Sequence, residues 1–184
     1  FAKPDAAKLL HAALSRPGYE VGPIALGTNT DPYQPIEERW RITRSILELL
    51  LETRHPFSIT TKSDRVLRDL DILAPAARLG LVSVAISVTS LDPSIHRTLE
   101  PRAPAARKRL AAVKALAAAG VGSEQLAQME RLDGAPVDGV AVHRHELRRS
   151  QRPRRTARRR QPHSERAARV RRCLAAIHTE QRRS

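Results

Sequence analysis

The spacing of apolar and polar positions divides the chain into two parts, and the pattern changes after Val121. Up to that residue, short apolar runs alternate with longer segments that carry an apolar residue every three or four positions. The short runs are typical of buried strands, and the longer spacing is typical of helices with one buried face. We therefore expect a folded part over 1–121 and a tail of low order over 122–184.

The folded part alternates predicted strands with predicted helices. Strands are expected over 21–26, 57–61 and 81–88. Helices are expected over 6–15, 36–53 and 105–119, with another that begins at Ser63 or Asp64 and runs through 70–77. Breaks are expected at Pro17-Gly18, Gly27, Gly80 and Gly120. This alternation predicts an α/β fold whose parallel strands are joined by right-handed crossovers.

In such folds ligands bind where the strands end, at their carboxyl edge. The residues directly after the three predicted strands are polar, and they span 28–31, 61–63 and 87–90. Polar residues are also common in any solvated loop, so the pattern alone leaves a binding role and a purely structural role open.

Composition narrows the possible chemistry. Hydrophobic residues make up 41% of the chain and aromatic ones only 3%, so the core must be aliphatic. No apolar stretch is long enough to span a bilayer. Cys173 is the single cysteine, which excludes a disulfide framework or a cysteine-bound metal site made by one chain alone. We expect a cytoplasmic location, and a natural start upstream of Phe1.

The chain carries a formal net charge of +14, and most of it lies in the tail. Up to Val121 there are 17 basic and 12 acidic residues, and after it 16 and 7, every basic one an arginine. Three interpretations of this tail stay open. It is a disordered segment without a function, an arm that binds nucleic acid, or the translation of GC-rich DNA in the wrong frame.

Four motifs occur in order along the folded part. They are GTNTDPYQPIE (27–37), SITTKS (58–63), VAISVTSLD (84–92) and LEPRAP (99–104), the last leading into RKRLAAVKALAAAGV (107–121). Together they resemble the radical S-adenosylmethionine enzymes of the spore photoproduct lyase-like group. The resemblance covers 1–121 and nothing beyond.

The resemblance implies a fold and a chemistry. Its members form a partial (β/α)6 barrel similar to a TIM barrel, of which this chain would hold about three βα units. A 4Fe-4S cluster is held by three cysteines spaced CxxxCxxC, S-adenosylmethionine binds to it, and a 5′-deoxyadenosyl radical results. In spore photoproduct lyase the substrate is a thymine lesion in DNA, and we do not carry that substrate over.

The resemblance also implies site residues. Those expected to bind S-adenosylmethionine are Thr28, Thr30, Asp31, Lys62, Ser87 and Thr89. Lys62 would meet the cofactor carboxylate, and oxygens of the 28–31 loop would accept from its ammonium. The expected substrate side holds Tyr33, Gln34, Glu100 and Arg102. From the residues alone, Asp31 is equally a turn or cap residue, and Glu100 with Arg102 equally a surface pair.

The chain departs from the family pattern in two places. The cluster cysteines do not occur in it, and the strand expected after Val121 is replaced by GSEQLAQMERLDG. We therefore expect a piece of a radical enzyme that is inactive alone, with a small-molecule cofactor as its partner and no membrane partner. The alternative is a basic protein that binds nucleic acid through its arginine-rich tail.

Overall fold

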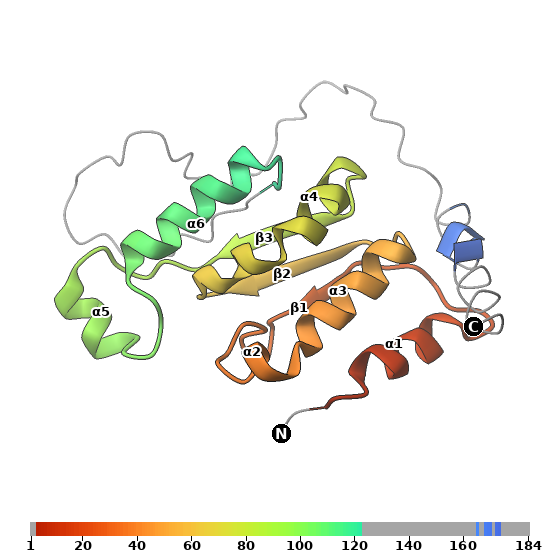
Figure 1. Cartoon of the computed structure of the whole chain (residues 1–184), viewed down its shortest axis with the longest axis horizontal. Coiled ribbons are helices and arrows are strands. Elements are labelled where there is room, and N and C mark those ends of the chain that lie inside the picture. Colours follow the sequence, from red (N-terminus) through yellow and green to blue (C-terminus); the bar gives the residue numbers. More distant parts are fainter. Residues whose placement is uncertain (1–2, 123–164, 166–167, 171, 174–184) are drawn as a thin grey trace, which may run out of the picture.

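The computed structural model describes residues 3–122, 165, 168–170 and 172–173. Its centre is a three-stranded parallel sheet in the order β1 (Ile24–Leu26), β2 (Phe57–Thr61) and β3 (Val82–Ile86). The elements around it are α1 (Ala6–Leu14), α2 (Glu37–Trp40), α3 (Ile42–Glu52), the 3-10 helix η1 (Asp64–Asp69), α4 (Leu70–Arg78), α5 (Pro93–Leu99) and α6 (Ala106–Ala118). Figure 1 shows the three strands in this order, with the helices around them. The predicted parallel α/β arrangement is confirmed, and it is consistent with a partial radical S-adenosylmethionine fold.

The register of the sheet brings the strand ends together. Phe57 of β2 pairs with Ile24 of β1 on one side and with Val82 of β3 on the other. All three strands run in the same direction, so the residues that follow them meet at one edge. The loop after β1, Lys62 after β2 and Ser87 after β3 therefore lie along the same carboxyl edge.

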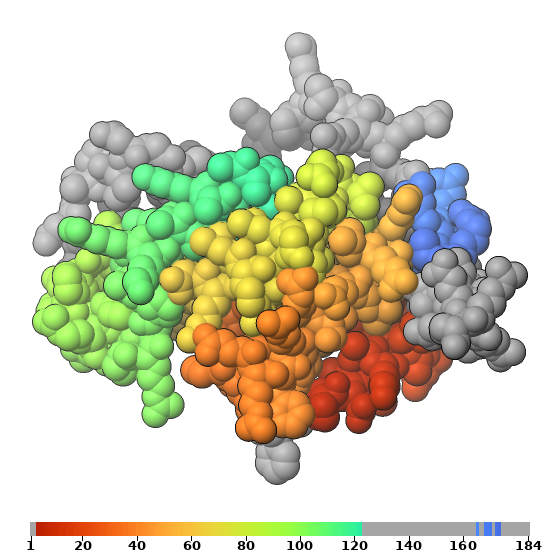
Figure 2. Space-filling model, viewed as in Figure 1, coloured from red at the N-terminus to blue at the C-terminus, as the bar shows by residue number. Residues whose placement is uncertain are grey.

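The core lies between one face of the sheet and the helices. Along β2 the buried residues alternate with half-buried ones, as the two-residue period of a strand requires. The buried face packs against α3, α4 and α6 through aliphatic side chains such as Leu47, Leu50, Leu73, Ala112 and Leu116. In Figure 2 the side chains of these helical segments form a continuous surface on the face in view. The opposite sheet face carries small or hydroxyl-bearing residues, namely Ala25, Ser58, Thr60, Ser83 and Ala85.

The prediction of a single helix over 36–53 is wrong, because two helices, α2 and α3, occupy this range. Arg41 adopts a left-handed conformation, with φ of 47°, and separates α2 from α3. The Glu37 carboxylate accepts the backbone N–H of Arg44 at 3.2 Å, so it satisfies a donor in the first turn of α3. The hydroxyl of Thr43 donates to the carbonyl of Pro32 at 2.6 Å. These side-chain contacts fix a break that hydrophobic spacing does not reveal.

Other elements also differ from the predictions. The first strand spans only Ile24–Leu26 rather than 21–26, because Pro23 within the predicted run cannot donate to a sheet ladder. Ser63 caps the next helix as predicted, accepting from the N–H of Arg65 at 3.2 Å, but the first turns are 3-10 helix. Helix α5 was not predicted, although Asp92 before Pro93 is a strong start signal, and Asp92 accepts the N–H of Ser94 at 2.6 Å.

The end of α6 returns the chain to the sheet. Gly120 has φ of +75° and ends the helix, as predicted. Val121 is buried, and the N–H of Val84 in β3 donates to the carbonyl of Gly122 at 3.1 Å. The chain therefore begins to run beside β3, where a fourth parallel strand would lie.

A few residues of the tail are part of the described structure. Residues 165, 168–170 and 172–173 are helical, and the side chain of Val170 is buried against Leu14 and Val21. The predictions of a nucleic-acid arm and of out-of-frame translation fall mostly on 123–164 and 174–184, which lie outside the described residues. In the described part of the chain, no helix is both long and apolar enough to cross a membrane.

Candidate functional site

A pocket of about 570 Å³ opens at the carboxyl edge of the sheet. Its walls come from the loop after β1, the end of β2, and the segment between α5 and α6. The residues that line it are Asp31, Tyr33, Gln34, Pro35, Lys62, Ser63, Arg65, Leu99, Glu100, Pro101, Arg102, Ala103 and Pro104. Six of the ten residues expected to form the site are among them, which places this pocket where strand order predicts a ligand.

Asp31 joins the loop after β1 to the end of β2. One of its carboxylate oxygens accepts from the N–H of Tyr33 at 2.8 Å and from the hydroxyl of Thr61 at 2.7 Å. The other accepts from the N–H of Lys62 at 2.8 Å. A carboxylate has about four acceptor positions, and the described residues use three of them, which leaves one for a ligand. The turn role considered for Asp31 is confirmed by its contact with Tyr33.

Gly27 allows the same loop to cross close to β2. Its φ is +92°, and a Cβ added there would lie 1.9 Å from the carbonyl oxygen of Thr60. A side chain is therefore excluded by both backbone conformation and space. The approach places Thr28 at the start of a loop that leaves the sheet, and Thr28 and Thr30 are exposed. Neither threonine is among the described residues that line the pocket.

Glu100 is the centre of a charged cluster at the back of the pocket. Its Oε1 lies 2.8 Å from Nζ of Lys62 and accepts from the hydroxyl of Thr89 at 2.6 Å. Its Oε2 accepts from Nη1 of Arg109 at 2.8 Å, and the same nitrogen donates to the carbonyl of Ser87 at 2.7 Å. The segments that follow β2, β3 and α5 thus meet α6 at one carboxylate.

The charge of Glu100 is strongly stabilised. Burial alone would raise the pKa of its carboxyl, but hydrogen bonds from Lys62, Thr89 and Arg109 outweigh burial and lower the pKa to about 2. Glu100 is therefore ionised at neutral pH although it is buried. The surface pair considered between Glu100 and Arg102 is wrong, because Glu100 faces inward to Lys62 and Arg109.

Arg109 is the residue of this cluster that sequence analysis missed. It is fully buried on α6, where a cation is rarely found without a partner. A signal did exist in the sequence. Arg109 stands three, four and seven positions before Ala112, Val113 and Leu116, on the apolar face of the helix. An arginine on a buried face is expected to have an internal carboxylate partner.

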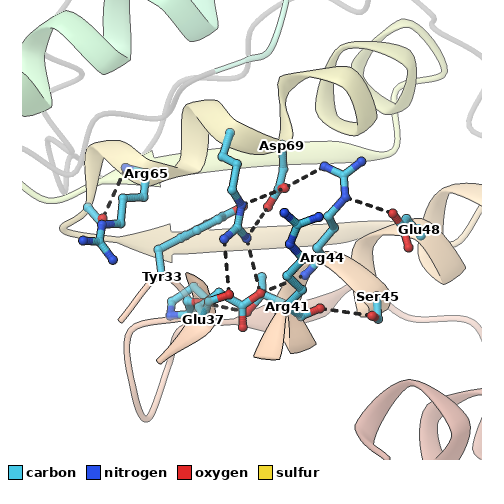
Figure 3. Close-up of polar contacts among 12 residues, drawn as sticks. Tyr33, Glu37, Arg41, Arg44, Ser45, Glu48, Arg65 and Asp69 are labelled. Carbon is cyan, nitrogen blue, oxygen red and sulfur yellow. Dashed lines mark hydrogen bonds and ion pairs between the residues drawn. The ribbon is translucent and has the colours of Figure 1, made fainter. Parts of the chain in front are cut away.

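A second charged network supports the opposite wall. Asp69 is fully buried and accepts from Arg44 at 3.0 Å and from Arg68 at 3.2 Å. Arg68 also reaches the Glu37 carboxylate at 3.3 Å, and its guanidinium lies 5.7 Å from the centre of the Tyr33 ring. Figure 3 shows Glu37, Arg44 and Asp69 around this point.

Tyr33 is held between this network and the pocket. Its side chain is buried, and its hydroxyl has no hydrogen-bond partner among the described residues. Burial, followed by the negative charge of Asp69, raises the pKa of Tyr33 well above its ordinary value. Tyr33 is therefore a neutral wall residue, whereas Gln34 and Arg102 are exposed side chains at the mouth.

Ser87 and Thr89 lie behind the pocket rather than on its described walls. Ser87 is tied to β2 by its N–H, which donates to the carbonyl of Thr61 at 2.9 Å, and to α6 through Arg109. Thr89 uses its hydroxyl on Glu100. The structure thus brings Lys62, Thr89 and Glu100 into direct contact, and leaves Thr28 and Thr30 outside this cluster.

The residues present do not fit an iron–sulfur cluster. Cys173 is the one cysteine of the sequence, and such a cluster needs three or four thiolates. Within the described residues no group of three His, Cys, Asp or Glu side chains is arranged to hold a metal ion. The pocket does fit a small molecule with a carboxylate, because the Lys62 side chain is half-exposed at its wall and offers charge-assisted hydrogen bonds.

Fold and site define an α/β protein with a ligand pocket at the carboxyl ends of its parallel strands. A family model for the Radical SAM superfamily matches residues 4–126. The chain belongs to this superfamily, whose members are enzymes that use S-adenosylmethionine and a 4Fe-4S cluster.

Several curated proteins are similar to the chain. An uncharacterized protein of Mycobacterium tuberculosis (strain ATCC 25618 / H37Rv) is 41% identical over 119 residues, which are 65% of this chain and 35% of that protein. An uncharacterized protein of Methanocaldococcus jannaschii is 33% identical over 100 residues, 54% of this chain and 37% of that protein. An uncharacterized protein of Acidianus two-tailed virus is 32% identical over 87 residues, which are 47% of this chain and 28% of that protein.

The chain spans about a third of the length of the curated relatives it matches. No solved structure matches it.

Proposed function

We propose that the chain is the part of a spore photoproduct lyase-like radical enzyme that binds S-adenosylmethionine. The observation that carries the proposal is the Lys62 ammonium, which Glu100 fixes at the wall of a pocket on the carboxyl edge of the sheet. The order of the four motifs from Gly27 to Pro104 supports the choice of group.

Each side of the pocket has a role in this proposal. Lys62 binds the carboxylate of S-adenosylmethionine, and the remaining acceptor position of Asp31 takes its ammonium. Ser87 and Thr89 align Lys62 through Glu100 and Arg109. Gln34 and Arg102, with the ring of Tyr33, form the substrate side of the mouth.

A 4Fe-4S cluster with bound S-adenosylmethionine would supply the radical chemistry of the superfamily. The cysteines for that cluster are not in this chain, so we propose that the chain alone is inactive. Release of 5′-deoxyadenosine from the chain after anaerobic reconstitution with iron and sulfide would contradict this. A cytoplasmic location belongs to the same proposal and rests only on the single cysteine.

The binding role of Lys62 is tested by calorimetry with S-adenosylmethionine. Replacing Lys62 with Met removes the charge-assisted hydrogen bond, and we expect a loss of affinity of about 10- to 100-fold. Lys114→Met is the matched control, because Lys114 is an exposed lysine on α6. Equal affinity in the Lys62→Met and Lys114→Met variants would exclude Lys62 from the site.

A second function is favoured by the charge distribution. After Val121 the chain carries 16 arginines against 7 acidic residues, an excess that could neutralise several phosphates. The alternative proposal is a nucleic-acid-binding protein that acts through this tail. Fluorescence polarisation with a labelled oligonucleotide compares the full chain with a chain ending at Val121. Binding that disappears with the tail and weakens steeply with salt supports it, whereas equal binding contradicts it.

A further inference from the structure

Arg109 places a positive charge beneath the pocket, inside the protein. It has no exposed surface, and its Nη1 donates to Glu100 at 2.8 Å and to the carbonyl of Ser87 at 2.7 Å. Its Nε and Nη2 have no hydrogen-bond partner among the described residues. A buried cation is costly, so a fully buried arginine that is only partly satisfied needs an explanation beyond packing.

Glu100 has a cation on each side. Arg109 approaches Oε2 from the interior, and Lys62 approaches Oε1 from the pocket, where the Lys62 side chain is 52% exposed. The three groups together carry two positive charges and one negative charge. Arg109 is fixed in the interior, whereas the exposed Lys62 ammonium is the cation that a ligand in the pocket can reach.

We infer that Arg109 is a positioning residue that balances the charge of Glu100 from the interior, so that the exposed Lys62 ammonium is available to pair with a ligand carboxylate. This inference rests on the proposed binding of S-adenosylmethionine. It identifies Arg109 as the residue that allows Lys62 to bind the ligand carboxylate. Without Arg109, Lys62 would be the sole counter-charge of Glu100 among the described residues. A ligand carboxylate would then compete with Glu100 for one ammonium and be repelled by its charge.

The test compares S-adenosylmethionine with its decarboxylated form, which lacks the group that Lys62 would bind. In the unaltered chain we expect S-adenosylmethionine to bind more tightly. Arg109→Met should lower the affinity for S-adenosylmethionine by about tenfold or more, and it should change the affinity for the decarboxylated form by no more than about twofold. Arg107→Met is the matched control, because Arg107 is an exposed arginine on α6.

A second substitution separates charge balance from structure. Adding Glu100→Gln to Arg109→Met removes the competing carboxylate, and we expect affinity for S-adenosylmethionine to recover to within about threefold of the unaltered chain. Arg109→Lys keeps the interior charge and should keep the preference between the two ligands. If Arg109→Met does not fold, the comparison of the two ligands is made with Arg109→Lys instead.

The outcomes distinguish this inference from the function on which it rests. If the unaltered chain does not bind S-adenosylmethionine, the proposed function fails and the inference with it. If the chain binds it but Arg109→Met weakens both ligands equally, or Arg109→Lys loses the preference, only the role of Arg109 is overturned. Carbon-13 spectra of the Glu100 carboxyl give a readout without ligand, because Arg109→Met must raise its titration midpoint. An unchanged midpoint would also overturn the inference.

Discussion

The hydroxyl of Thr61 donates to the carboxylate of Asp31 at 2.7 Å, across 30 positions of sequence. This contact ties the loop after β1 to the last residue of β2, and the N–H of Lys62 donates to the other oxygen of the same carboxylate. Asp31 therefore sets the distance between two walls of the pocket. It also fixes the backbone of Lys62, the residue that we propose to bind the ligand, by accepting the Lys62 N–H.

Replacing Asp31 with Asn is expected to lower the free energy of unfolding by about 2 kcal/mol. The amide has one acceptor oxygen instead of two, so its NH2 group would face either the N–H of Lys62 or the N–H of Tyr33 together with the Thr61 hydroxyl. Urea denaturation monitored by circular dichroism measures the change. Asp5→Asn is the control, because Asp5 is exposed and pairs with the exposed Lys8 at the surface. A loss no larger than that of the control would show that Asp31 does not hold the loop.

Much of the fold could be predicted from the sequence, because its elements follow local patterns. The strand over 57–61 and the stops at Gly80 and Gly120 were predicted from apolar runs and from glycine, and both glycines have positive φ. The break at Arg41 could not be predicted in this way. It depends on the Glu37 carboxylate reaching the N–H of Arg44, a contact that exists only in three dimensions.

The candidate site was predicted in part, for the same reason. Motif order pointed to Asp31, Lys62 and Glu100, and the structure brings all three to one pocket. Residue spacing offered Arg102 as a possible surface partner of Glu100, because the two are near in the chain, whereas Arg109 is near in space. Contacts between elements depend on helix rotation and sheet register, which residue spacing constrains only loosely.

Replacing Gly27 with Ala is expected to lower the free energy of unfolding by about 3 kcal/mol or more. The new methyl group would lie 1.9 Å from the Thr60 carbonyl, in a backbone conformation with φ of +92°. Gly80→Ala is a matched control, since Gly80 has φ of +66° but no atom within 4 Å of the added Cβ. Gly80→Ala should lower the free energy of unfolding by only about 1 kcal/mol. Equal losses in thermal or urea denaturation would mean that the loop can move away from β2.

Acid is expected to remove the stabilising effect of Glu100. Its pKa is about 2 in the folded chain against 4.5 for an ordinary glutamate, so the unfolded chain takes up the proton first as pH falls. The contribution is therefore complete above about pH 5, where it amounts to about 3 kcal/mol, and it is lost between about pH 4.5 and pH 2.

The measurement is the difference in free energy of unfolding between the unaltered chain and Glu100→Gln, taken from urea curves at several pH values. Gln leaves the fully buried Arg109 without a charged partner but does not titrate, so other carboxylates affect both chains alike. The advantage of the unaltered chain should fall to less than half by about pH 3. A difference that stays constant from pH 6 to pH 3 would show that the Glu100 carboxylate does not have a lowered pKa, and with it the charge balance proposed for Arg109 would lose its basis.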